Sequence, residues 1–197
     1  MTDAVTRSRA VIDAAHAADP ELRDGQPAEL VYGMAVERWV VSLLPTASAV
    51  LCLAARAQHL ERWTLPRSAY PMDKIGYHAW RTEQYRRQGA RAKELCLQAG
   101  LPASDADHVE RLVAKKALRD PDGQVLEDAA CLVFLESEIS VFAANHAGYT
   151  AEKYIDILRK TMRKMSPEGR RRALALALPE PIAALVRQAA TMLQNTP

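Results

Sequence analysis

Prolines separate the apolar stretches of this chain, and their placement constrains the fold more than any other feature. Most of the eleven prolines fall between segments whose apolar residues recur at helical spacing, and only eight glycines occur. A proline inside a helix or a central strand removes a hydrogen bond, so these prolines mark the ends of elements. Alanine and leucine dominate the segments, and alternating β-branched or aromatic stretches do not occur in the sequence. The pattern predicts an all-α fold, a single compact helical bundle.

Helical periodicity, caps and breakers together divide the chain into nine expected helices. Their ranges are Thr6–Ala18, Ala28–Leu44, Ala47–Trp63, Lys74–Ala99, Asp105–Leu118, Val125–His146, Ala151–Lys164, Pro167–Ala177 and Pro181–Leu193. We expect N-caps at Thr46, Asp73 and Ser166, and a turn at 120–123. Seven consecutive apolar residues at 129–135 predict that the sixth helix is buried. Because no repeat or flexible linker interrupts the pattern, residues 1–197 are predicted to form one domain.

Composition excludes several classes of protein. With 49% hydrophobic and 25% charged residues over 197 positions, the chain is typical of a globular domain rather than a disordered, collagen-like or disulfide-framework protein. A formal charge of +2 disfavours a dedicated bulk nucleic-acid binder. Three widely spaced cysteines favour a reducing compartment. The N-terminal stretch has no signal-peptide core, and no uncharged window is long enough to span a membrane, so we expect a cytoplasmic protein with no membrane partner.

The first candidate site lies where the third expected helix turns polar and runs into a proline-fixed loop. His59 and Arg62 are three residues apart and would share a helix face. Arg67 follows in the loop, and a guanidinium suits a carboxylate or a phosphate. This pattern predicts an anion held beside His59, which would act as a general acid/base. The alternative is an ordinary helix C-terminus, where cationic side chains interact favourably with the helix dipole.

The second candidate site precedes the apolar run 129–135. Asp128 projects to the same side as the apolar residues three, four and seven positions further on. A carboxylate on a buried stripe is costly unless it is paired or bound to a metal. We expect such a partner across the core: His59, Arg62 or Lys116. The alternative is that carboxylates in the first turn stabilise the N-terminus of their helix.

Basic clusters suggest a different kind of function. Seven Lys and Arg residues fall between positions 159 and 172, opposed there only by Glu168, and a second cluster includes Arg81. Such clusters could bind the phosphates of RNA or of a nucleotide. Solvated helix faces also produce them, and the aromatic residues that a single-strand reader needs are few here. The common signatures of metalloproteases, P-loop and Rossmann nucleotide sites and serine hydrolases do not occur in the sequence.

Several strings in the sequence carry a family resemblance. AARAQHLERW, PRSAYPMD, GYHAWR, LEDAACLVFLE, DILRKTMRKMS and LALPEP resemble the family known as domain of unknown function 4202, from about Val11 to Ala189. The resemblance implies a compact helical domain and brings no established activity.

A more distant likeness is to the HD-domain metal phosphohydrolases, whose His-Asp doublet, further histidines and distant aspartate hold a divalent metal. On this likeness His59 is similar to the histidine of the doublet and Asp128 to the distant aspartate. Leu60 stands where the doublet has aspartate, and no His-Asp pair occurs in the chain. The ligand set for a divalent metal is thus incomplete, so no metal ligand is assigned and the resemblance implies a metal-free or altered site.

The sequence therefore supports two interpretations. The first is a degenerate HD-like hydrolase. Its helical pocket would bind a small anion, either a nucleotide or a phosphorylated metabolite. Its expected catalytic residues are His59, Glu61 and Asp128, with Glu61 or Asp128 orienting the imidazole. Its expected substrate-binding residues are Arg62, Arg67, Tyr70, Asp73, Arg81, Lys116 and Glu127. The second interpretation is a non-catalytic module that binds RNA or a protein partner through the 159–172 surface. The sequence does not indicate whether the chain forms homo-oligomers.

Overall fold

The computed structural model describes residues 2–117, 119–146 and 148–194. It confirms an all-α fold, since the only strands in the described residues are two short ones, β1 (Leu22–Arg23) and β2 (Gln26–Pro27), paired antiparallel around a tight turn. The chain groups into two compact units, residues 1–126 and 127–197. That the whole chain is a single domain stays a prediction.

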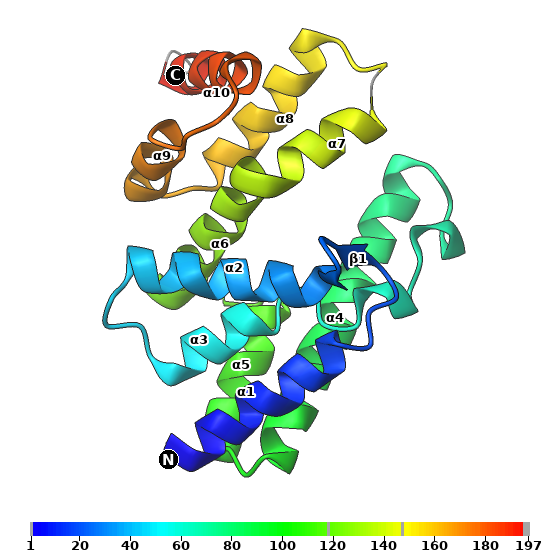
Figure 1. Ribbon diagram of the computed structural model, residues 1–197, viewed down its shortest axis with the longest axis vertical. Coiled ribbons are helices and arrows are strands. Elements are labelled where there is room, and N and C mark those ends of the chain that lie inside the picture. The colour runs from blue at the N-terminus through cyan, green and yellow to red at the C-terminus, as the bar shows by residue number, and fades with distance from the viewer. Residues whose placement is uncertain (1, 118, 147, 195–197) are drawn as a thin grey trace. The chain divides into compact units, whose positions relative to one another are not determined.

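The first unit holds five helices and the start of a sixth (Figure 1). They are α1 (Thr2–His16), α2 (Ala28–Leu43), α3 (Ala49–Arg56), α4 (Lys74–Gln98), α5 (Ala103–Val113) and α6 (Pro121–Val133), the last of which continues into the second unit. Between α3 and α4 lie two 3-10 turns, η1 (Arg62–Thr64) and η2 (Arg67–Ala69). The short apolar helix α3 forms much of the core, because Leu51, Leu53 and two alanines on it are fully buried. It packs against α1, α2 and α5.

Arg56, the last residue of α3, ties three helices together. Its guanidinium donates to both oxygens of Asp13 on α1, at 2.6 and 2.9 Å, and to Glu37 on α2 at 3.3 Å. Its carbonyl oxygen lies 3.0 Å from Nε2 of the buried His16. At this point α2 and α3 approach closely, since a Cβ on Gly33 would lie 2.4 Å from the Arg56 carbonyl oxygen. Only glycine leaves room for this crossing.

The second unit contains the end of α6 and the remaining helices. These are the π-helical turn η3 (Phe134–Glu138), α7 (Ile139–Asn145), α8 (Ala151–Arg163), α9 (Pro167–Leu174) and α10 (Glu180–Gln194). At η3 the amide of Ile139 donates to the carbonyl of Phe134, five residues back, so the helix holds one residue more than α-helical spacing allows. After α7, the Tyr154 hydroxyl donates to the carbonyl of His146 at 2.9 Å, and its ring packs against Phe142. As the sequence predicts, the apolar run 129–135 is largely buried.

Several boundaries differ from the expected ones. The N-cap of α3 is Ser48 rather than Thr46, while Asp73 and Ser166 cap α4 and α9 as expected. Residues 121–123, expected in a turn, form the first turn of α6, because a proline at the start of a helix already has the helical φ and needs no amide donor there. The helix expected to reach Trp63 ends at Arg56.

Among the described residues, no helix combines the length and the apolar character that crossing a membrane requires.

Candidate functional site around His59

The chain after α3 forms a tight turn that presents polar side chains. His59 and Glu61 both have left-handed backbones, with φ of 63° and 51°. A non-glycine residue in this region costs about 1–2 kcal/mol, so other contacts must hold the turn. The helix that the sequence extends to Trp63 ends at Arg56, before this turn. Such strain in an otherwise regular helical fold is typical of functional sites.

Both ring nitrogens of His59 have partners. Nδ1 lies 3.0 Å from a carboxylate oxygen of Glu29, in the first turn of α2, and Nε2 lies 3.1 Å from the Arg62 guanidinium. Because a guanidinium can only donate, Nε2 accepts and Nδ1 carries the proton given to Glu29. The ring also stacks on Tyr32, with centroids 4.0 Å apart and planes 5° from parallel. The imidazole is therefore held in one orientation and one tautomer.

The electrostatic environment keeps His59 neutral. Burial has the largest effect and lowers the pKa of His59. The charge of Glu29 raises this pKa, and the positive charges of Arg62 and Lys115 lower it further. Burial alone would raise the pKa of Glu29, but its electrostatic attraction to His59, the hydrogen bond from His59 and the charge of Arg62 outweigh this effect and lower that pKa. The His59 side chain is still 27% exposed. A neutral, oriented imidazole can accept a proton at Nε2 once Arg62 leaves that nitrogen.

Arg62 is positioned by aromatic and backbone contacts. Its guanidinium lies 5.0 Å from the centroid of the Trp80 ring, within the range of a cation–π interaction. The amide of the buried Gln84 donates to the carbonyls of Arg62 and Leu65, and the Trp80 indole also donates to Leu65. The structure thus brings together His59 and Arg62, the first pair that the sequence singled out.

Arg67 and Asp73, two further candidates from the same segment, stabilise the loop between α3 and α4. Arg67 donates to the backbone carbonyls of Tyr70, Pro71 and Asp73, at 3.0, 2.6 and 3.2 Å. The Asp73 carboxylate accepts from the Gly76 amide and caps α4. These contacts give Arg67 and Asp73 a structural role in fixing the loop, and that they bind a substrate stays a prediction.

Three further candidates have partners of their own or lie at the surface. Glu61 pairs with Arg91 at 3.1 Å, so the carboxylate that contacts His59 belongs to Glu29. Arg81 hydrogen-bonds to the hydroxyls of two tyrosines on its own helix. Lys116 is exposed, and its neighbour Lys115 is the lysine whose charge acts on His59.

Asp128 and Glu127 belong to the second unit. The buried Asp128 accepts from the backbone amide of Ser166 at 2.8 Å and from its hydroxyl at 2.5 Å, at the N-terminus of α9. Glu127 lies 3.6 Å from Lys164. These contacts satisfy the buried carboxylate within its own unit. That Asp128 and His59 share one site stays a prediction.

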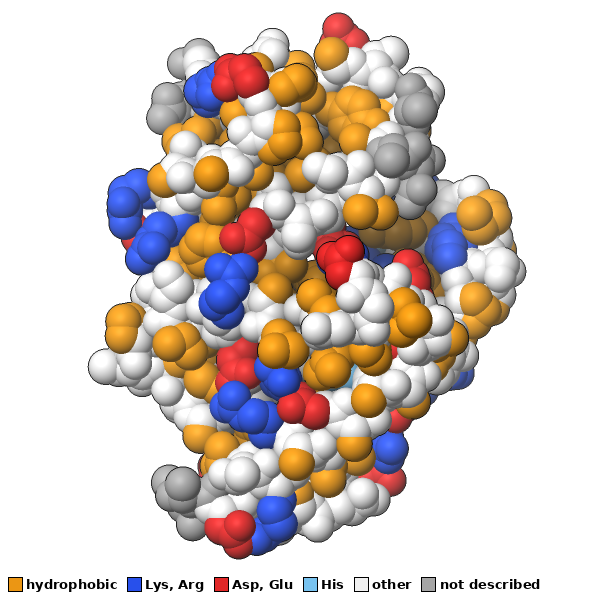
Figure 2. Space-filling model, in the orientation of Figure 1, with side chains coloured by type: hydrophobic (Ala, Val, Ile, Leu, Met, Phe, Trp, Pro, Cys, Tyr) orange, Lys and Arg blue, Asp and Glu red, His pale blue; other side chains and the backbone are white. Residues whose placement is uncertain are grey.

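Four of the seven basic residues between 159 and 172 form ion pairs with carboxylates on their own helices. Arg159 and Lys160 pair with Asp156, and Arg171 and Arg172 pair with Glu168. On the face drawn in Figure 2, blue side chains mostly have red ones beside them and do not gather into one patch. Interspersed charges of both signs give a weaker field than a phosphate-binding face needs.

Sequence reasoning missed Glu29, Tyr32, Trp80 and Lys115. Glu29 lies 30 positions before His59 and looks like an ordinary first-turn carboxylate of α2. The only signal in the sequence was that Glu29 and Tyr32 are three apart on a helix and so share a face.

The described residues contain no group of three or more His, Cys, Asp or Glu side chains that could hold a metal ion. The ligand set for a divalent metal is incomplete in the sequence as well.

Comparison with known proteins assigns the chain to a family. The family described as "Domain of unknown function (DUF4202)" matches residues 6–186, and the chain belongs to it. No curated protein and no solved structure matches the chain.

The contact between Asp128 and α9 generates a test of stability. A Cβ on Gly169 would lie 2.6 Å from Asp128 Cγ, so we expect Gly169→Ala to destabilise the protein by about 1–3 kcal/mol through overpacking. Urea unfolding measures the loss. Gly148→Ala is the control, because nothing lies within 4 Å of its added Cβ. Equal stability of the two variants would contradict the tight contact.

The buried histidine beside Arg56 predicts a pH dependence of stability. Burial lowers the pKa of His16, so below its unfolded value of 6.5 the unfolded chain binds a proton that the folded chain does not. The free energy of unfolding should therefore fall as the pH drops from 7 to 5.5, with a slope approaching about 1.4 kcal/mol per pH unit for this group. His16→Gln, which keeps a donor for the Arg56 carbonyl, should flatten the dependence. His78→Gln, at an exposed position, should not.

Proposed function

We propose that this protein binds a small anion, a nucleotide or phosphorylated metabolite, next to His59, and that His59 transfers a proton during its hydrolysis. The hydrogen-bonded chain Glu29–His59–Arg62 supports this proposal. In it a carboxylate orients the imidazole, and a guanidinium stands where a phosphate oxygen would bind. Lys115 adds a second positive charge, which lowers the pKa of His59.

The proposed reaction uses the two nitrogens of His59 differently. Nδ1 donates to Glu29 throughout, which holds the ring and stabilises the imidazolium once it forms. Arg62 moves from Nε2 to the phosphate of the substrate and leaves Nε2 able to take a proton from water. The water oxygen then bonds to phosphorus, the bond to the leaving oxygen breaks, and His59 returns the proton to that oxygen. An HD-like hydrolase lacking its metal ligands is one form of this proposal.

RNA or protein binding by the 159–172 surface remains the alternative function. It is the weaker one because four of its cations are paired with carboxylates on their own helices.

Thermal denaturation with inorganic phosphate, pyrophosphate and a nucleoside monophosphate tests the proposal. A ligand at 100 times its Kd adds roughly 2.7 kcal/mol, which raises the Tm by a few degrees. We expect at least one anion to stabilise the protein and to release phosphate if it is an ester. Both effects should disappear in Arg62→Gln and in His59→Asn, which tolerates the left-handed backbone.

His78→Asn is the matched control, because His78 is an exposed histidine on α4 and should leave the stabilisation unchanged. If no anion stabilises the wild type, or if the His59 and Arg62 variants respond as it does, the proposal is wrong. RNA binding that weakens with salt and is lost in Arg170→Gln/Arg171→Gln, with no response to small anions, would instead support the alternative.

A further inference from the structure

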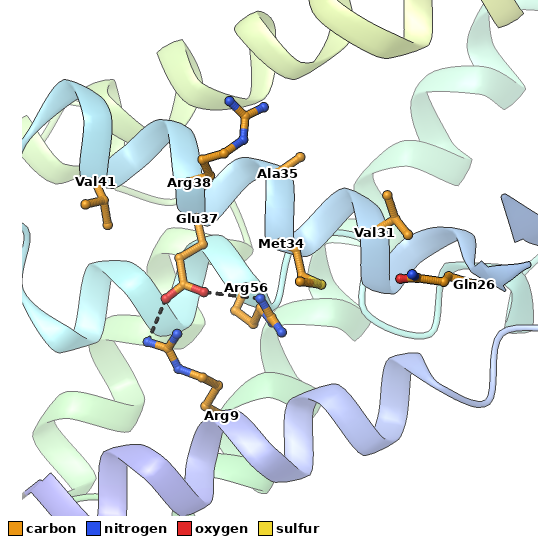
Figure 3. Close-up of a pocket in the computed structure, with 9 residues that line it drawn as sticks. All are labelled: Arg9, Gln26, Val31, Met34, Ala35, Glu37, Arg38, Val41 and Arg56. Atoms are coloured by element: carbon orange, nitrogen blue, oxygen red, sulfur yellow. Dashed lines mark hydrogen bonds and ion pairs between the residues drawn. The ribbon is translucent and has the colours of Figure 1, made fainter. Parts of the chain in front are cut away.

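A hollow lies in the first unit, along α2 and apart from His59. Its volume is about 620 Å³, within the range of small-molecule pockets. The residues that matter for its chemistry are Arg9, Met34, Glu37, Arg38, Val41 and Arg56. Figure 3 shows Arg9 of α1 and Arg56 of α3 reaching Glu37 of α2, with Met34 on the same side of that helix. None of the catalytic or substrate-binding residues predicted from the sequence lines this hollow.

Part of its wall is apolar and open to solvent. Met34 is 46% exposed and Val41 is 47% exposed, although both are large hydrophobic residues. They are seven residues apart, two helical turns, and so lie on one face of α2 about 10 Å apart along its axis. Single exposed apolar residues are ordinary, but two that line the same concave surface provide a contact area for an apolar ligand.

The polar part of the wall has an excess of positive charge. Arg9, Arg38 and Arg56 line the hollow with one carboxylate, Glu37, which gives a formal charge of +2, although Arg38 extends away from the other three in Figure 3. Asp13, which binds Arg56, reduces this to +1. Arg9 lies 2.6 Å from Glu37 and its side chain is 42% exposed, whereas the side chains of Arg56 and Glu37 are only 11% and 9% exposed. An incoming anion would therefore meet Arg9 first, with Arg56 and Glu37 fixed beneath it.

We propose that this hollow binds a small amphipathic anion, an aliphatic or aromatic carboxylate. Its charged group would pair with the exposed side of Arg9, and its apolar body would cover Met34 and Val41. Charge complementarity selects an anion over a neutral or cationic ligand, and the exposed aliphatic side chains select an amphiphile over a small inorganic ion. This site does not depend on the proposed function of His59.

The probe is 8-anilinonaphthalene-1-sulfonate, whose fluorescence rises when its apolar rings leave water. Titration into the full chain should show one saturable site. Met34→Glu places a negative charge on the apolar wall, and Arg9→Gln removes the cation that pairs with the anion. Each should raise the Kd of the probe by about tenfold or more, the equivalent of losing one good contact. Met72→Glu is the control, because Met72 is 80% exposed on a different segment.

Displacement of the probe by decanoate or by 1-naphthoate distinguishes an aliphatic from an aromatic ligand, and either result supports the site. Thermal denaturation without probe confirms that the variants are folded, so that weaker binding is not a sign of unfolding. The proposal is wrong if the wild type does not bind the probe saturably or if neither carboxylate displaces it. It is also wrong if Met34→Glu binds as tightly as the wild type, or if Met72→Glu weakens binding as much. Variants of His59 and Arg62 should bind the probe normally, which separates this site from the other.

Discussion

The first unit depends on the ion pairs made by Arg56 at the end of α3. One guanidinium holds Asp13 of α1 and Glu37 of α2, and its own carbonyl meets His16. Its side chain is 11% exposed, so the charge is largely removed from water and would be costly without both carboxylates. Burial raises the pKa of Glu37, and the arginines counteract this. These contacts therefore fix the position of the C-terminal end of α3, from which the chain continues to His59.

The turn that follows Arg56 combines backbone strain with side-chain contacts that offset it. His59 and Glu61 are both left-handed, and each has a carboxylate or guanidinium partner from a different helix, Glu29 and Arg91. These partners explain why the chain leaves the helical path that its local propensity favours. They also orient the imidazole more narrowly than a solvent-exposed helix end would, because a strained backbone persists only when several contacts hold it.

Local signals in the sequence predicted most of the fold. Periodicity and capping residues gave the all-α class and the caps at Asp73 and Ser166, because such signals act within a few residues. His59 and Arg62 were found together because they are close in sequence. Glu29 was not, since its pairing with His59 depends on how α2 packs against α3. For the same reason, the sequence could not indicate that Asp128 would meet Ser166, or that Arg9, Glu37 and Arg56 would surround a hollow. The sequence also could not distinguish Lys115 from Lys116. Lys115 has a left-handed backbone and its charge acts on His59.

The extra residue in the π-helical turn at 134–138 determines which way the following helix faces. Each residue in an α-helix turns the chain by about 100°, so removing one residue here would rotate everything after it by that angle. Phe142 would then no longer point to Tyr154, whose ring centroid lies 6.3 Å from its own. The insertion therefore changes the direction in which the second half of the helix faces. The first half of this continuous helix is buried through one set of side chains, and the second half is directed toward Tyr154 of α8.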